Sequence, residues 1–75
     1  MKIPDQTIIK ISTIVADSIE DPSIRHNLRQ KIAIFAGLSG LKNEVRDGPA
    51  KLRKVRAHII NICAKQGVQI LKYTK

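Results

Sequence analysis

The sequence predicts a mainly α-helical fold of three to four short helices, followed by a short C-terminal β-strand. Apolar residues recur every three or four positions over most of the 75-residue chain, which is the spacing of one helix face. The three prolines each stand where such a stretch begins. In residues 68–73 the spacing changes to a loose alternation of β-forming residues, which favours a strand there.

The first helix is predicted over about 4–19, beginning at Pro4. Its apolar stripe consists of Ile8, Ile11, Val15 and Ile19. Residues 7–16 contain one charged side chain, Lys10. This almost uncharged surface is therefore a candidate homodimer contact, although packing in the protein's own core is the simpler interpretation.

The second helix is predicted to begin at Pro22, with Asp21 as its N-cap. Proline is tolerated at the first helical position, and a carboxylate there accepts hydrogen bonds from free backbone N–H groups. The apolar face continues to about Ala36 through Ile24, Leu28, Ile32 and Phe35. Gly37 is then predicted to end the helix in a left-handed conformation.

A short helix is predicted next, with Ser39 as its N-cap. It would hold Leu41 and Val45 on one side. The Asp-Gly-Pro sequence at 47–49 is a strong helix breaker and should end it.

The last helix is predicted over 50–66, with Gly67 as its stop. At ~100° per residue, one face is apolar and should pack on the first two helices. That face consists of Leu52, Val55, Ile59, Ile62 and Cys63. Cys63 is the single cysteine, and we expect it to be a buried apolar residue.

Charge separates two parts of the chain, which carries 14 Lys and Arg against 6 Asp and Glu, a net charge of +8. Residues 1–24 hold two basic and four acidic residues (2 − 4 = −2), and residues 25–75 hold twelve and two (12 − 2 = +10). Such a one-sided field is typical of a protein that binds a polyanion. We therefore expect residues 1–75 to form a single nucleic-acid-binding domain.

The outward face of the last helix has the composition that a helix in the major groove of DNA requires. Lysine and arginine neutralise phosphates, Ala57 allows close approach, Asn61 can contact an adenine edge, and His58 can donate to a base or phosphate. Four cations within residues 51–56 repel one another unless an anion is near. Arg56 is expected at the edge of the apolar face. The predicted nucleic-acid-binding residues are Lys51, Arg53, Lys54, Ala57, His58, Asn61 and Lys65, together with Lys42, Arg46 and Lys72 outside the helix.

Two stretches resemble families of DNA-binding proteins. Residues 32–39, Ile-Ala-Ile-Phe-Ala-Gly-Leu-Ser, resemble the "hydrophobic-Ala-x-x-x-Gly-hydrophobic-Ser" turn of repressor-type helix-turn-helix proteins. Residues 55–70 resemble the recognition helix and first wing strand of winged-helix domains of the response-regulator type. The second resemblance implies that the last helix is the recognition helix, that residues 68–71 open a reduced wing, and that residues 47–49 belong to the loop before the helix.

Several function classes are not expected from this sequence. Two histidines, one cysteine and no clustered carboxylates give no metal-ligand set, and no phosphate-binding loop or nucleophile–base arrangement is recognisable, so neither an enzyme nor a cofactor is predicted. The N-terminus resembles neither a signal peptide nor a membrane span, and the single cysteine suits a reducing compartment. Cytoplasmic residence without membrane contact is the expectation.

The leading hypothesis is a sequence-selective duplex DNA-binding protein, a transcriptional regulator or accessory factor, that reads the major groove with helix 50–66. The alternative is a protein-interaction module that docks this helix on an acidic partner such as a polymerase subunit. RNA binding is disfavoured by the presence of only two aromatic residues, Phe35 and Tyr73. Binding to a membrane surface is disfavoured because the apolar side of the basic helix lacks Trp and Phe.

Overall fold

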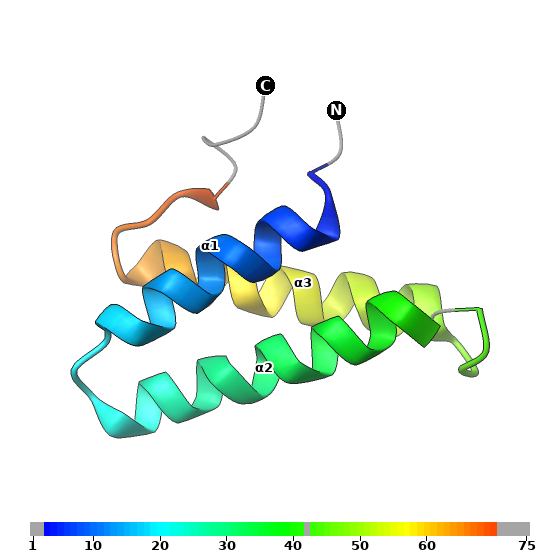
Figure 1. The fold of residues 1–75 in the computed structure, drawn as a ribbon, viewed down its shortest axis with the longest axis horizontal. Helices are drawn as coiled ribbons and strands as arrows, with labels where there is room; N and C mark the ends of the chain where they lie inside the picture. The colour runs from blue at the N-terminus through cyan, green and yellow to red at the C-terminus, as the bar shows by residue number, and fades with distance from the viewer. Residues whose placement is uncertain (1–2, 42, 71–75) are drawn as a thin grey trace.

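The computed structural model describes residues 3–41 and 43–70, and these form three helices and no strand. The helices are α1 (Asp5–Ser18), α2 (Pro22–Leu41) and α3 (Gly48–Lys65). α2 packs against both other helices, and α1 and α3 contact each other less extensively. Figure 1 shows that α1 and α3 run in one direction and α2 runs in the opposite one. The principal extents are 36 × 30 × 15 Å, and the mainly α-helical prediction is confirmed.

α1 matches the predicted helix closely. Pro4 precedes it, and the Pro4 carbonyl accepts from the N–H groups of Thr7 and Ile8 at 3.0 and 3.3 Å. The side chains buried by this helix are Ile8, Ser12, Val15 and Ala16. The buried Ser12 hydroxyl donates to the Ile8 carbonyl at 2.6 Å, so it makes the hydrogen bond that a buried polar group needs. The apolar stripe of α1 is therefore part of the core.

α2 begins as predicted but continues further. The Asp21 carboxylate accepts from the Ser23 N–H at 2.9 Å and more weakly from the Ile24 N–H at 3.4 Å, which confirms the N-cap. The predicted end at Gly37 is wrong, because α2 runs through this residue to Leu41. An interior glycine destabilises a helix by only about 1 kcal/mol, which tertiary contacts can outweigh.

The segment predicted as a short fourth helix belongs partly to α2 and partly to turns. Ser39 is not an N-cap, since the residue lies within α2. Its hydroxyl donates to the Asp5 carboxylate of α1 at 2.7 Å. Residues 43–47 form turns, in which the Leu41 carbonyl accepts from the Val45 N–H at 3.1 Å. This connection reverses the chain between α2 and α3. The turn of the repressor-type resemblance at residues 37–39 is accordingly absent, because that segment is helical.

No strand occurs between residues 3 and 70 as far as the structure describes them, so a strand beginning at residue 68 is not found. Residues 68 and 69 have no regular structure, Ile70 lies in a 3₁₀ turn, and the rest of the predicted strand, 71–73, lies outside the described residues. A lone extended segment has no neighbouring strand to pair its backbone groups with. Instead Ile70 is fully buried, and Val68 packs against the core.

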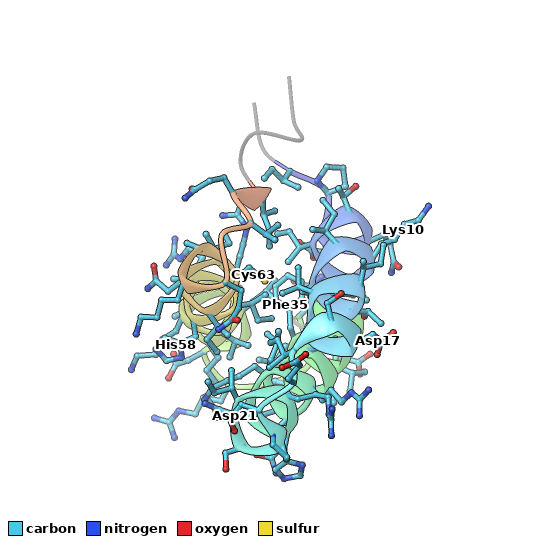
Figure 2. The ribbon with its side chains drawn as sticks, turned by 90° about the vertical axis from the view of Figure 1, so that its left-hand side faces the viewer. Lys10, Asp17, Asp21, Phe35, His58 and Cys63 are labelled. Atoms are coloured by element: carbon cyan, nitrogen blue, oxygen red, sulfur yellow. The ribbon has the colours of Figure 1, made fainter. Side chains whose placement is uncertain are left out.

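The core lies between the three helices. Its largest fully buried side chains are Phe35, Ile8, Leu28, Ile59, Ile70, Cys63 and Ser12. The expectation that Cys63 is a buried apolar residue is confirmed, and burial raises the pKa of its thiol to about 11. Figure 2 shows Cys63 and Phe35 in the interior between α1 and α3.

Candidate nucleic-acid interface

Local sequence signals fix both ends of α3. Asp47 precedes it in a left-handed conformation (φ 56°), and the Lys51 N–H donates to the Asp47 carbonyl at 2.9 Å. At the other end Gly67 has φ 86°, a conformation that glycine adopts without strain. The Val68 N–H donates to the Cys63 carbonyl and the Gly67 N–H to the Ala64 carbonyl, both at 3.0 Å, which is the Schellman pattern. The predicted stop at Gly67 is confirmed.

The inner face of α3 holds the helix against the rest of the protein. Ile59 and Cys63 are fully buried, and the other apolar residues of this face, Leu52, Val55 and Ile62, are half-buried and pack against the core. This anchored face leaves the opposite side of α3 open to solvent. All seven site residues predicted on α3 are exposed: Lys51, Arg53, Lys54, Ala57, His58, Asn61 and Lys65.

Five of these side chains form one row along α3. At ~100° per residue the row occupies ~80° of the helix circumference, and at ~1.5 Å per residue it is ~21 Å long. In chain order it consists of Lys51, Lys54, His58, Asn61 and Lys65. We call these residues the α3 row. Ala57 lies beside it, and Arg53 lies further around the helix. Lysines therefore stand at both ends of the row, with His58 and Asn61 between them.

The remaining predicted residues are less closely tied to this face. Arg46 is exposed in the turns before α3. Lys42 and Lys72 lie outside the described residues. A hollow of about 310 Å³ opens at the start of α3 and is lined by Asp47, Ala50, Lys51 and Lys54. Its position allows another molecule to approach the first turns of the helix.

The cations of α3 lack carboxylate partners within the described part of the chain. α3 itself carries five basic residues and no acidic one. Among residues 3–41 and 43–70 the one ion pair joins Arg29 of α2 to Asp17 of α1, at 3.0 Å. In Figure 2, Asp17 and His58 lie on opposite sides of the molecule. The basic face thus keeps its positive field.

Arg56 combines charge with burial in a way that the sequence indicated only in part. The residue is half-buried, as expected for a side chain at the edge of the apolar face. Its Nε is buried and has no hydrogen-bond partner among the described residues. Helical periodicity placed the residue at this edge, but it gives no information about the partners of a single nitrogen.

No protein-family model matches the chain, and no curated protein and no solved structure matches it. Among the residues described, no helix combines the length and apolar character needed to cross a membrane.

Proposed function

We propose that this chain is a sequence-selective duplex DNA-binding protein that places the outer face of α3 in the major groove. The observation that carries the proposal is the α3 row, an exposed line of three lysines with His58 and Asn61 between them, on a helix without carboxylates. A solvated helix face needs no such placement of an imidazole and an amide between lysines. Transcriptional regulation, or an accessory role at a DNA site, is the function class that this binding would serve.

The dimensions of α3 suit the groove. The major groove is ~12 Å wide and admits one α-helix. With 18 residues, α3 is ~27 Å long and is exposed along its outer side. Lys54 and Lys65 are ~16 Å apart along the axis, so they can contact phosphates on either side of the bases that Asn61 faces. Ala57 adds little bulk beside the row and allows the backbone to come close.

Each group has a distinct role in this proposal. The lysines contribute binding that is independent of sequence and weakens with salt, because they displace counterions from phosphates. Asn61 contributes discrimination, because its amide can donate to N7 and accept from N6 of one adenine. His58 adds a second donor next to Asn61 on the same face.

The test is a titration of labelled duplex DNA, random and selected, at several salt concentrations. We expect a log–log salt slope near −4.5, set by about five phosphate contacts. Lys54→Ala should weaken binding to every duplex and reduce the slope by about 1. Lys10→Ala is the matched control, since Lys10 is exposed and lies on the side of the molecule opposite His58 (Figure 2).

Equal effects of the two lysine substitutions would show that only net charge matters and would refute the role of α3. Binding to an acidic polypeptide that outcompetes every duplex would instead favour docking of α3 on an acidic protein.

A further inference from the structure

The three Arg and Lys side chains of α2 lie on two different sides of the helix. Arg25 donates to the Ile19 carbonyl at 3.2 Å, and Arg29 pairs with Asp17 of α1 at 3.0 Å, so both lie on the α1 side. At ~100° per residue, Lys31 is ~160° around α2 from Arg29 and lies away from α1. Lys31 has no carboxylate partner among the described residues. It thus differs from both arginines, whose guanidinium groups already contact α1 or its C-terminal end.

The side of α2 that carries Lys31 is covered by α3. Lys31 and Leu38 stand seven residues apart, and therefore on one side of the helix, and both are half-buried. The fully buried Leu28 and Phe35 lie between this side and the side that contacts α1. α3 is the other helix that packs against α2. It accounts for the half-burial of Lys31 and Leu38, and a lysine in such a place packs its stem and keeps its ammonium in water.

Lys31 lies at the level of His58 in the α3 row. Figure 1 shows the end of α2 beside the start of α3, with the two helices antiparallel. Lys31 stands ten residues before Leu41, and His58 stands ten residues after Gly48, so each is ~15 Å along its helix from that shared end. The ammonium of Lys31 therefore belongs to the middle of the row and not to either end of it.

α3 turns the flank that carries Val55 and His58 towards α2. α1 and α3 are parallel and pack on α2 from different sides, so relative to their core stripes they turn opposite flanks to it. On α1 that flank carries Asp5, ~60° after Ile8 in the sense in which the helix turns. On α3 it therefore precedes the buried Ile59, and Val55 and His58 precede Ile59 by ~40° and ~100°. Figure 2 shows His58 on the side of the molecule away from α1.

We propose that Lys31 binds a phosphate at one edge of the major groove while α3 lies in the groove, so that α2 stands over that strand. The inference rests on the function proposed for α3 and extends the contact surface to a second helix. Packed helix axes are ~8–10 Å apart and the major groove is ~12 Å wide, so a cation on α2 beside α3 reaches the edge of a groove that α3 occupies. Arg53, ~120° from the middle of the α3 row and turned away from α2, then meets the other strand.

The charges around Lys31 favour a phosphate there. Asp5 and Asp17 contact the other flank of α2. The acids at 20 and 21 precede α2, ~15 Å or more along its axis from Lys31. Those at 44 and 47 lie in the turns before α3, together with Arg46, at a similar distance from the level of His58. An anion between Lys31 and the α3 row thus meets cations first, and lysine contributes to such contacts as a point charge.

The first test is a salt titration of duplex binding by Lys31→Met, which removes the charge and keeps an unbranched apolar stem. We expect affinity for selected and random duplex to fall by the same factor, with the log–log salt slope reduced by about 1. Arg29→Met is the matched control, because it removes one charge from the α1 side of the same helix, and it should leave the slope unchanged. Equal changes in the two variants would mean that net charge alone acts and would overturn the proposal. A reduced slope in Lys54→Ala with an unchanged slope in Lys31→Met would overturn the role of α2 and leave that of α3 intact, whereas a lack of duplex binding would refute both.

A second test locates α2 on the duplex. Lys31→Cys and Arg53→Cys each introduce a thiol that carries an iron–EDTA cleavage reagent, while the buried Cys63 stays unlabelled. On a duplex selected by the wild-type protein, hydroxyl radicals from residue 31 should cut mainly one strand, and those from residue 53 mainly the other. Cleavage of the same strand at the same positions from both residues, or no cleavage from residue 31, would contradict the placement of α2. Far-UV circular dichroism of each variant verifies that it is folded.

Discussion

α1 and α3 are built alike on their inner sides and differently on their outer sides. Both begin beside a proline and bury one apolar face in the same core. The acids of α1 serve the fold, since Asp5 accepts from the Ser39 hydroxyl and Asp17 pairs with Arg29, both on α2. The five cations of α3 have no such partner among the described residues. The carboxylates that contact a neighbouring helix thus lie on α1, and the cations without a carboxylate partner among the described residues lie on α3.

The largest expected effect concerns the inner faces of α1 and α3, because the comparison requires both faces to be anchored equally in the core. Ile8 on α1 and Ile59 on α3 are both fully buried. Ile8→Ala and Ile59→Ala should each lower the free energy of unfolding by about 2–5 kcal/mol, the range for large-to-small core substitutions. Urea unfolding followed by circular dichroism measures both. A loss below about 1 kcal/mol at Ile59 would mean that α3 is not anchored as described.

The second prediction contrasts the inner and outer faces of α3 through thiol chemistry. Burial raises the pKa of the Cys63 thiol from 9.0 to about 11, so at pH 8 it is protonated and shielded and should react with Ellman's reagent only as fast as the chain unfolds. A thiol introduced by Ala57→Cys, on the exposed side, should react at once. Rapid labelling of Cys63 in the wild-type chain would contradict its burial.

The raised pKa of the Cys63 thiol also predicts that the free energy of unfolding depends on pH. The folded-state pKa of Cys63 lies above the unfolded value, so between these values the unfolded chain releases a proton that the folded chain keeps. The contribution of the buried, protonated thiol to the free energy of unfolding is complete below about pH 9 and declines as the pH rises towards about 11. Cys63→Ala should remove that part of the decrease in the free energy of unfolding at alkaline pH. Wild-type and Cys63→Ala curves that stay parallel from pH 8 to 11 would contradict the raised pKa.

The smallest expected effect concerns the ion pair between α1 and α2. Arg29 and Asp17 are 55% and 63% exposed, and exposed pairs contribute about 0–1 kcal/mol. Asp17→Asn should therefore change the urea midpoint only slightly and leave the DNA salt slope unchanged. A clear change in that slope would show that the α1 side of the molecule also faces the DNA.

Sequence reasoning succeeded where neighbouring residues alone decide the structure. Asp21 before Pro22 and Gly67 after Lys65 act within one helical turn, and both helix ends lie where the sequence placed them. The prediction that this helix ends at Gly37 failed because the stability of α2 beyond Gly37 depends on distant contacts, including the hydrogen bond between Ser39 and Asp5. The strand was expected from side-chain preference, but a strand also needs a partner, which local sequence does not reveal.

The candidate site was predictable to a similar extent. Helical periodicity was enough to assign the inner and outer faces of α3, including the exposure of Asn61 and His58. That the α3 cations form no ion pair with the carboxylates of the described residues is a three-dimensional property that required the fold.

The most direct measurement is the specificity ratio of Asn61→Ala, taken as affinity for a duplex selected by the wild-type protein over affinity for random duplex. We expect affinity for the selected duplex to fall by about five- to a hundredfold, the range for one bidentate base contact, with little change for random duplex. Lys54→Ala, measured alongside, should weaken both about equally. An unchanged ratio in Asn61→Ala would contradict the central claim that the outer face of α3 reads bases.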